Sequence, residues 1–249
     1  MTAVREFVEA DEWRGNRLLD CLPIAEREVV LGRAESVTLR TGQVLAEAGQ
    51  PLDHGYFPRG GMLSLVAVIE DGTMVEASTI GNEGMFGLQI VAGVDSSSNL
   101  RTMCQIDGEA LRVSTNDLRE LGRPGTKLHT LLMRYGHALF IQAAQAVLCN
   151  RRHSAEQRCA KWLLLSHDRV GRDSFRLTQE FLAQMLGVRR ASVTTVANEL
   201  RRRSLIEYHR GAITILDRAG LEAASCVCYA VIREEYDNYL RMAASAASA

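Results

Sequence analysis

The amino-acid sequence predicts an α+β protein with a β-rich N-terminal part, a long helix and a C-terminal winged helix. Three observations support this prediction. Residues 36–113 alternate short strand-like runs with glycine-centred turns, a pattern typical of a β-sandwich or barrel. Residues 126–150 carry the longest run of apolar side chains at helical spacing. Residues 177–208 contain two short helical patterns, and a β-hairpin pattern completes the wing.

The chain before the β-rich region is expected to be an arm followed by one short helix. Residues 1–18 are polar and of mixed charge, which is typical of an arm. A short helix is expected to open after Pro23 within residues 19–34, because proline is tolerated in the first turn of a helix. Its inward face would consist of four apolar residues, Ala25, Val29, Val30 and Leu31.

The helix predicted over residues 126–150 has a heptad seam of the kind found in two-stranded coiled coils. The seam steps by four and three residues and consists of Leu128, Leu132, Tyr135, Leu139, Gln142 and Ala146. Neighbouring stripes are also apolar, one of them formed by Met133, Phe140 and Val147. A helix that is apolar on two faces can pack on its own β-domain and on a partner at once. We therefore expect a dimerisation helix; the alternative is a single amphipathic helix that covers its own domain.

Residues 177–208 predict two helices joined by a tight turn. Thr178 is suited to cap the first helix, and Gly187 is suited to end it in the left-handed conformation. The second helix is apolar on one face and rich in hydrogen-bond donors on the other, as expected of a helix in the major groove of DNA. The alternative is an ordinary helical hairpin with an arginine-rich surface, but the strand patterns at 205–208 and 212–216 add a wing and favour DNA binding. The predicted DNA-binding residues are Thr178, Gln179, Arg189, Arg190, Ser192, Thr194, Thr195, Asn198, Arg201 and Arg203.

The chain is expected to divide into four parts. Residues 1–122 would form the arm and the β-rich domain, 123–150 the dimerisation helix, 151–220 the winged helix, and 221–249 a C-terminal helix and tail. The helical pattern after the wing runs over residues 221–242. Ser154 is suited to cap the first helix of the winged-helix domain, so the hinge is expected near residues 150–154.

Charge is unevenly distributed along the chain. The net charge of the 249 residues is −1, but residues 150–218 hold 14 Lys and Arg against 7 Asp and Glu. A basic C-terminal third beside an acidic remainder fits contacts with DNA phosphates that are confined to one domain. The composition, 47% hydrophobic and 24% charged, is ordinary for a globular protein.

The six cysteines are scattered, and the sequence shows neither a signal peptide nor an apolar run of membrane-spanning length. We therefore expect a cytoplasmic protein with reduced thiols and no membrane partner. Cys226-x-Cys228 lacks a second ligand pair at metal-binding spacing. No metal site is expected, and these two cysteines are expected to pack in the C-terminal helix.

The order of these parts resembles one family, the CRP/FNR family of bacterial transcription regulators. The resemblance covers residues 20–218, and its strongest signature is LTQEFLAQMLGVRRASVTTVANELRRRSLI, residues 177–206. A second match, IGNEGMFG at 80–87, resembles the glycine-rich turn of the family's cyclic-nucleotide pocket. The resemblance implies a cyclic-nucleotide-binding-like β-roll (jelly roll) that senses an effector. It also implies a homodimer that binds double-stranded DNA, with RNA polymerase as a further partner.

The glycine-rich turn departs from the pattern of the relatives that bind cyclic AMP, in which Gly-Glu-x-Gly is followed by an arginine that clamps the phosphate. Here Asn82 follows Gly81, so Glu83 comes one place late. The clamp position falls near Ser98, and Arg101 lies too close to the next strand. We therefore expect an effector other than cyclic AMP, or none. The candidate effector pocket consists of Gly81, Asn82, Glu83, Gly84, Ser98, Arg101 and Thr102.

Two other cofactors of the family are not expected. Cys21 is the only cysteine among the first hundred residues, so the N-terminal cluster that holds an iron–sulfur centre in some relatives is absent. A haem would need an axial ligand near the β-domain, where His54 and Cys104 are candidates by location alone.

The recognition helix departs from the family pattern as well. Relatives that read the common TGTGA-type half-site carry an Arg, then a Glu, then a second Arg. Here Arg190 matches the first Arg, whereas Ala191 and Thr195 replace the other two. The operator is therefore expected to differ, because the contact of the Glu with cytosine is lost. Gln179 matches a position that contacts backbone phosphate, and Arg201 and Arg203 are expected to do likewise.

The sequence therefore predicts a transcription regulator that binds a pseudo-palindromic operator as a homodimer. The alternative is an effector-independent DNA-binding scaffold dimer whose β-roll is a protein-interaction module. An enzyme is not expected, because the β-domain sequence offers no Ser/His/Asp, paired-carboxylate or metal-spaced constellation.

Overall fold

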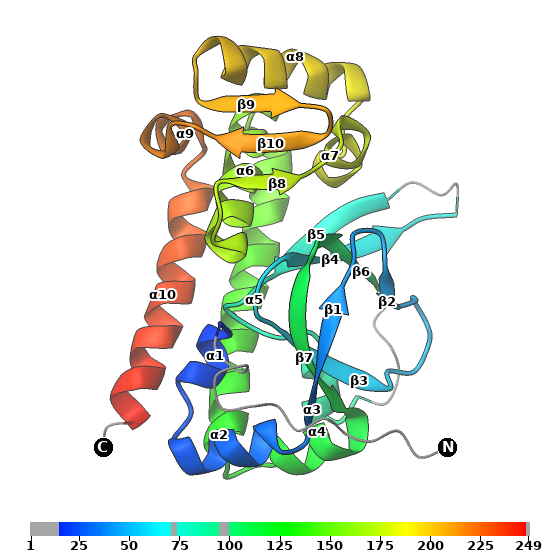
Figure 1. Cartoon of the computed structure of the whole chain (residues 1–249), viewed down its shortest axis with the longest axis vertical. Coiled ribbons are helices and arrows are strands. Elements are labelled where there is room, and N and C mark those ends of the chain that lie inside the picture. The colour runs from blue at the N-terminus through cyan, green and yellow to red at the C-terminus, as the bar shows by residue number, and fades with distance from the viewer. Residues whose placement is uncertain (1–14, 71–73, 95–99, 248–249) are drawn as a thin grey trace.

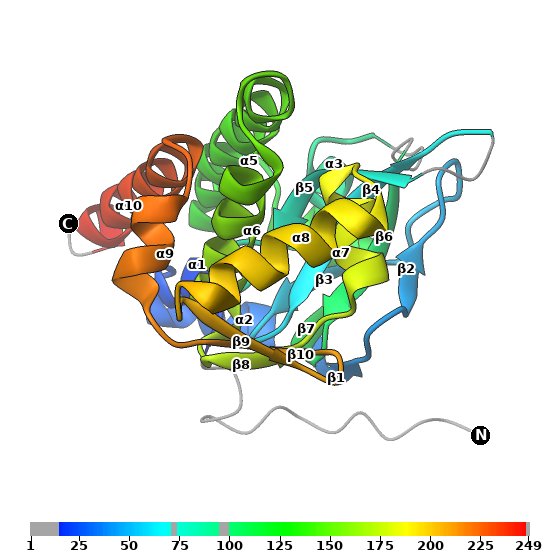
Figure 2. The same cartoon turned by 90° about the horizontal axis from the view of Figure 1, so that it is seen from above.

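The computed structural model describes residues 15–70, 74–94 and 100–247, so the predicted arm lies largely outside the described residues. The β-rich domain lies beside a long helix, and the winged helix lies at one end of the molecule (Figure 1). The last helix follows the long helix on the side away from the strands (Figures 1 and 2). This arrangement confirms the predicted α+β fold.

Two antiparallel sheets form the β-rich domain. One has the strand order β1-β7-β3 and the other the order β2-β6-β4-β5. The first strand therefore pairs with the last strand of the domain, as the closure of a roll requires. The strands are β1 Ala34–Leu39, β2 Val44–Ala46, β3 His54–Pro58, β4 Met62–Val68, β5 Met74–Ile80, β6 Leu100–Ile106 and β7 Gly108–Ser114.

Four short helices accompany these sheets: α1 Arg17–Asp20, α2 Ile24–Leu31, α3 Leu88–Val91 and α4 Thr115–Leu121. Helix α2 begins after Pro23, as predicted. The prediction of its inward face holds at Val30, which is buried, and at Leu31, which is half-buried against the core, but it is wrong at Ala25 and Val29, which are exposed. Helix α2 contacts β1, and its Glu26 accepts hydrogen bonds from the amides of Lys127 and Leu128 at the start of the long helix.

The predicted long helix is α5, Lys127–Arg152, and the hydroxyl of Thr126 caps its start by accepting a hydrogen bond from the amide of His129 at 3.0 Å. The predicted heptad seam needs a correction, because its residues face their own chain and not the surface. Leu132 and Tyr135 are fully buried and Gln142 is 4% exposed, while Leu128 is also buried and Leu139 and Ala146 are half-buried.

The apolar stripe that α5 does expose is the neighbouring one. Met133 is 42%, Phe140 67% and Val147 74% exposed. The seam is buried because β5 and the last helix of the chain both pack against α5.

The winged helix is confirmed. It consists of α6 Ala155–Val170, β8 Ser174–Arg176, α7 Gln179–Leu186, α8 Arg190–Arg202, β9 Ile206–His209 and β10 Ala212–Ile215. Ser154 caps α6 in a capping box with Gln157. The strand β8, which the sequence did not predict, pairs with β10 and gives the sheet order β8-β10-β9.

Backbone conformation fixes both turns of the winged helix. Gly187 ends α7 with φ of 60°, the left-handed conformation predicted for it. Arg210 and Gly211, with φ of 49° and 77°, form the two-residue loop between β9 and β10. Positive φ at both positions is what a type I′ hairpin turn requires.

The single C-terminal helix predicted over residues 221–242 is instead two helices, α9 Arg218–Ala224 and α10 Cys228–Ala247. They are separated at residues 225–227, where the chain turns before α10 runs back along α5 (Figure 1). Arg134 near the start of α5 donates to the carbonyl of Met242, and Cys149 near its end contacts Cys226, so the two helices are antiparallel. Among the helices that the structure describes, none is long and apolar enough to cross a lipid bilayer.

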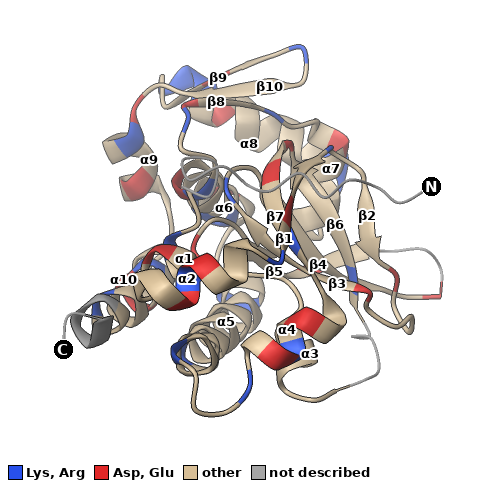
Figure 3. Ribbon diagram, turned by 60° about the horizontal axis from the view of Figure 1, so that its bottom comes forward, with Lys and Arg blue, Asp and Glu red and all other residues tan. Residues whose placement is uncertain are grey.

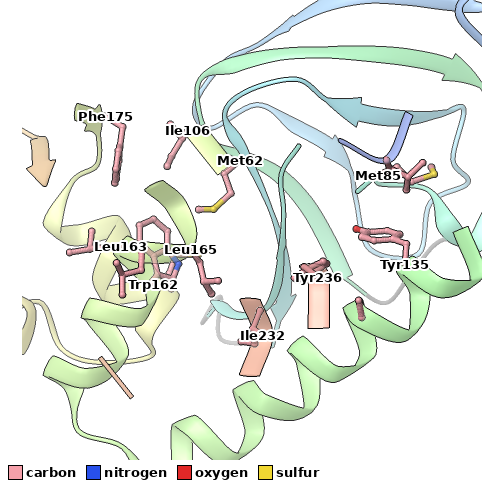
Figure 4. Packing of buried hydrophobic residues seen from close by; sticks show 14 of the residues in the cluster. Met62, Met85, Ile106, Tyr135, Trp162, Leu163, Leu165, Phe175, Ile232 and Tyr236 are labelled. Atoms are coloured by element: carbon pink, nitrogen blue, oxygen red, sulfur yellow. The ribbon is translucent and has the colours of Figure 1, made fainter. Parts of the chain in front are cut away.

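The β-rich domain and the winged helix share one hydrophobic core. Trp162 and Leu165 of α6 belong to the same buried cluster as Met62 and Ile106 of the β-rich domain (Figure 4). The indole nitrogen of Trp162 donates to Glu76 of β5 at 3.0 Å. The two domains are therefore packed together and not merely linked.

Candidate nucleic-acid interface

Helix α8 lies across the outer end of the molecule, next to α7 and the wing (Figure 2). Its buried face is apolar and includes Val193, Ala197 and Leu200. The opposite face is exposed at Arg190, Ser192, Thr195 and Asn198. The helix therefore presents its donors to the outside while its apolar face anchors it to the domain.

Two residues that are predicted to contact DNA also connect the first turn of α7 to α8. Thr178 caps α7 and accepts a hydrogen bond from the amide of Phe181 at 3.2 Å. The hydroxyl of Thr194 donates to Oε1 of Gln179 at 2.8 Å. Gln179 and Thr194 are half-buried, so they hold the two helices in register and leave the amide group of Gln179 near the surface.

The arginines at the ends of α8 differ in how firmly they are held. Arg190 is 68% exposed and its Nε lies 3.8 Å from a carboxylate oxygen of Glu180, an exposed pair that is worth little. Arg189 and Arg201 are also exposed. Arg203 is less available than predicted, because it donates to Glu156 at 2.8 Å.

The wing adds a basic residue that the sequence analysis did not select. Arg210 lies exposed at the turn of the hairpin, where the ribbon in Figure 3 carries the colour of Lys and Arg. The Arg210-Gly211 pair, which is typical of a hairpin turn, could have placed this arginine at the tip of the wing. The basic surface therefore extends from α8 to the tip of the wing.

The glycine-rich turn at residues 80–87 is enclosed by the chain itself. Glu83 is 4% exposed, and its Oε1 accepts hydrogen bonds from Nε of Arg169 at 2.8 Å and from the amide of Gly81 at 3.2 Å. Arg169 belongs to α6 and also donates to Oε1 of Gln142 at 2.7 Å and to the hydroxyl of Thr79. A buried ion pair therefore joins the winged helix to the turn where the effector was expected.

The two glycines at the start of this turn are required by packing. A Cβ atom at Gly81 would lie 2.3 Å from Cγ of Arg169, and one at Gly84 would lie 2.0 Å from the ring of Tyr135. Both distances are far below contact, so any larger residue would push the neighbouring helices away. The glycines that resemble a ligand-binding turn here allow α5 and α6 to approach.

Helices α1 and α10 complete the enclosure. The hydroxyl of Tyr239 donates to the carbonyl of Glu83, and Nδ2 of Asn16 donates to the carbonyl of Gly84 at 2.9 Å. The amide of Arg17 donates to the carbonyl of Asn82 at 2.7 Å. A cavity of about 190 Å³ lined by charged residues remains beside the turn, at the junction of α6 and α10.

The structure does not bring the predicted effector pocket together. Gly81, Asn82, Glu83 and Gly84 form the enclosed turn, which follows Ile80 of β5. Arg101 is paired with Glu47 at 2.8 Å and lies opposite Val66, in line with Glu76 rather than with Ile80. Thr102 is buried, and Ser98 lies outside the described residues. Strand register places Arg101 in line with Glu76 and Thr102 in line with Ser78, before the turn that follows Ile80, so the assignment of both residues to one pocket with the turn is corrected.

The two residues considered for haem ligation lie in different sheets. His54 is half-buried in β3, and burial lowers its pKa. Cys104 is buried in β6, where its Sγ lies 3.4 Å from the carbonyl of Ile106 and burial raises its pKa to about 12.

The C-terminal cysteines do acquire the partners that the sequence analysis did not find. The break between α9 and α10 places Cys226 and Cys228 beside Cys149 and His153 at the end of α5. The second ligand pair was present in the sequence as Cys149-x-x-x-His153, one helical turn apart, but it lies far from Cys226 along the chain. The expectation that no metal site exists therefore rested on sequence spacing alone.

The comparisons find the same arrangement of a β-roll, a long helix and a winged helix in known proteins. Residues 157–224 match the family model of the Crp-like helix-turn-helix domain. Among solved structures, FixK2 from Bradyrhizobium japonicum superposes with a TM-score of 0.65 at 17% identity, covering 78% of this chain and 98% of that one. A CRP/FNR-family transcriptional regulator from Thermus thermophilus gives 0.61 at 23% identity, with coverages of 77% and 98%.

A third similar structure is CLP, the c-di-GMP responsive global regulator of Xanthomonas campestris, with a TM-score of 0.55 at 16% identity and coverages of 77% and 98%. The comparison with curated proteins gave no significant match. The predicted resemblance is confirmed: the chain has the fold of the CRP/FNR transcription regulators, and its C-terminal part carries a Crp-like helix-turn-helix domain.

Proposed function

We propose that the protein regulates transcription by binding a pseudo-palindromic DNA site as a homodimer. The observation that carries the proposal is the exposed donor face of α8 on a Crp-like helix-turn-helix domain. The positive charge of residues 150–218 supports it, because DNA affinity arises largely from phosphate contacts. The altered residues Ala191 and Thr195 give this dimer an operator different from the common TGTGA-type site.

The dimer forms through the exposed stripe of α5, in place of the seam proposed from the sequence. Met133, Phe140 and Val147 are each seven residues apart, so they follow one side of the helix. Leu148, which is 45% exposed, extends the same surface. A second copy of this helix would bury these apolar side chains, which are costly to leave in water.

Any effector acts elsewhere than in a cyclic-AMP pocket of the usual kind. Arg169 and Tyr239 occupy the contacts around Glu83 that a ligand would need. An effector would therefore act by opening this contact between the domains, or it would bind at another site. The same enclosure favours the second candidate function, a DNA-binding dimer that needs no effector and uses its β-roll as a protein-interaction module.

Selection of bound sequences from random DNA, with and without cell metabolites, tests the proposal. We expect enrichment of an inverted repeat with half-sites about one helical turn apart. Failure to enrich any sequence from the full-length reduced protein would contradict sequence-specific binding. Enrichment that is unchanged by metabolites would favour the effector-independent dimer.

Thermal unfolding of the protein with individual nucleotides separates the two candidates further. A ligand that binds the native state raises the melting temperature with its concentration. We expect no shift with cyclic AMP. A saturable shift with cyclic AMP would overturn the conclusion that the clamp is lost.

A further inference from the structure

Four side chains with metal-ligating atoms converge at the junction of α5, α6 and the α9–α10 break. Cys149 lies in the last turn of α5 and His153 is the C-cap residue of that helix. Cys226 lies in the break, and Cys228 is the first residue of α10. The four ligand atoms all lie within 4.8 Å of one another.

The spacing of these atoms suits a single tetrahedral ion. Sγ of Cys149 lies 3.6 Å from Sγ of Cys226, and Sγ of Cys228 lies 3.6 Å from Nδ1 of His153. With Zn–S bonds of about 2.3 Å and Zn–N bonds of about 2.0 Å, the ligand atoms of a tetrahedral site are about 3.3–3.8 Å apart. An iron–sulfur cluster would need wider spacing between some of the ligand atoms, because its ligands are divided among separate irons.

Packing alone gives no reason for three thiols to share one place. Cys149, Cys226 and Cys228 are 0%, 4% and 0% exposed and form a small buried cluster of their own. The other three cysteines, Cys21, Cys104 and Cys159, are not members of it. Three thiols and an imidazole in contact are the donor set of a structural zinc site.

The ammonium of Lys161 on α6 lies near the thiol of Cys149. Three thiolates around a divalent cation carry a net charge of −1, which the positive charge of Lys161 would offset.

We propose that Cys149, His153, Cys226 and Cys228 bind one Zn²⁺ ion in a closed Cys₃His site. All four coordination positions are filled by side chains of the chain, so the ion is structural and offers no open position for a substrate. Binding releases the thiol protons to solvent as the thiolates coordinate the ion.

The site lies where the long helix meets the winged helix. Cys149 and His153 precede Ser154, the cap of α6, and Cys226 follows the wing and α9. The ion therefore ties both chain connections of the winged helix to the end of α5. Loss of zinc would therefore loosen the recognition helices and weaken DNA binding without changing α8. This consequence rests on the proposed function.

Metal analysis of the full-length protein, purified under reducing conditions without added chelator, tests the site. We expect about one zinc per chain in the wild type and in a Cys21→Ala control, and less than about a tenth of that in Cys149→Ser and Cys228→Ser. Iron with acid-labile sulfide in place of zinc, or a Cys149–Cys226 disulfide in the protein as isolated, would overturn the proposal. So would loss of zinc from the control.

A second measurement needs no variant and therefore does not depend on variant folding. After removal of zinc with a chelator, addition of Co²⁺ to the wild type should give the intense visible bands of a tetrahedral ion and the thiolate charge-transfer bands, both abolished by one equivalent of Zn²⁺. Weak bands typical of octahedral Co²⁺ would contradict the site. Zinc binding without any DNA binding would contradict the proposed function and leave the site standing.

Discussion

At the scale of single residues, Arg169 joins the winged helix to the β-roll through an ion pair whose side chains are only 4% and 5% exposed. Its partner Glu83 has no further hydrogen bond at Oε2 among the described residues. Such a pair adds little stability as a whole, but removing one member leaves a buried charge without compensation.

We expect Arg169→Met to lower the free energy of unfolding by about 3–5 kcal/mol. Adding Glu83→Gln should recover much of this loss, because the buried negative charge is then removed as well. Urea unfolding of the wild type, both single variants and the double variant measures the coupling. Losses that simply add in the double variant would show that the two groups do not interact.

Glu76 gives the contact between the domains a dependence on pH. The carboxylate accepts hydrogen bonds from Trp162 at 3.0 Å and from Ser64 at 2.7 Å, but burial dominates and raises its pKa from 4.5 to about 7. The folded state therefore holds the proton more tightly than the unfolded state. The cost of ionising Glu76 is absent below about pH 4.5, grows as the pH rises and is complete above about pH 7.

We expect Glu76→Gln to remove this part of the pH dependence. Each unit of pKa shift corresponds to about 1.4 kcal/mol, and since Glu76 is only half-buried we expect a difference of about 1–2 kcal/mol. Urea unfolding of both proteins between pH 5 and 8 measures it. The free energy of unfolding of the wild type should fall relative to the variant as the pH rises; parallel curves would contradict the assignment.

Arg190 and Arg201 form a matched pair on α8, since both are exposed but only Arg190 is expected to contact a base. We expect Arg190→Ala to weaken binding to the selected operator by about 1–3 kcal/mol and to relax specificity at one base pair. Arg201→Ala should weaken specific and non-specific binding alike and reduce the salt dependence. Fluorescence anisotropy titrations on both kinds of DNA decide this. Equal weakening of both by Arg190→Ala would make it a phosphate contact.

At the scale of elements, α5 illustrates which features could be predicted from the sequence and which could not. Periodicity identified the helix and both apolar stripes, because each follows from local spacing. It could not tell which stripe faces a partner, because α10 covers the seam and its residues lie far along the chain from α5. Tyr135 packs against Tyr236 and Tyr239 of α10, with ring centroids 6.4 and 6.1 Å apart.

We expect Phe140→Asp to convert the proposed dimer into monomers, because it would place a charge in the middle of the exposed stripe of α5. Ile24→Asp on α2 is the matched control, since Ile24 and Phe140 are 66% and 67% exposed. Sedimentation equilibrium measures the association. A dimer that persists in Phe140→Asp would exclude this stripe as the interface.

The other elements show the same division between local and distant information. The two helices of the helix-turn-helix, the turn at Gly187 and the wing could be predicted, because caps, glycines and alternation are local signals. The strand β8 spans only Ser174–Arg176 and is defined by its pairing with β10, which no local pattern reveals. The contact of Cys149 with Cys226 is likewise a property of the packed chain.

At the scale of the whole molecule, the domains depend on close approach at the glycine-rich turn. The sequence correctly singled out Gly81 and Gly84 but attributed them to a ligand, because the side chains that fill the space come from α5 and α6. The structure explains these two glycines by the close packing of Arg169 of α6 and Tyr135 of α5 against the turn.

We expect Gly81→Ala to push α6 away from the turn, because the added Cβ would lie 2.3 Å from Cγ of Arg169. Overpacking of this kind costs about 1–3 kcal/mol. The rate of proteolysis near residues 150–154 should rise and the melting temperature should fall. Gly60→Ala is the control, because a Cβ atom there meets nothing within 4 Å. Equal behaviour of the two variants would contradict the packing role of Gly81.

The placement of α10 also bears on how the protein is made. The hydroxyl of Tyr239 reaches the carbonyl of Glu83 across 156 residues of sequence. Chains emerge from the ribosome N-terminus first, so the β-roll and α5 appear well before the helix that covers them. Until α10 is synthesised, the side of α5 that carries Tyr135 is exposed to solvent and chaperones. The β-roll therefore reaches its final packing only after α10 has been translated.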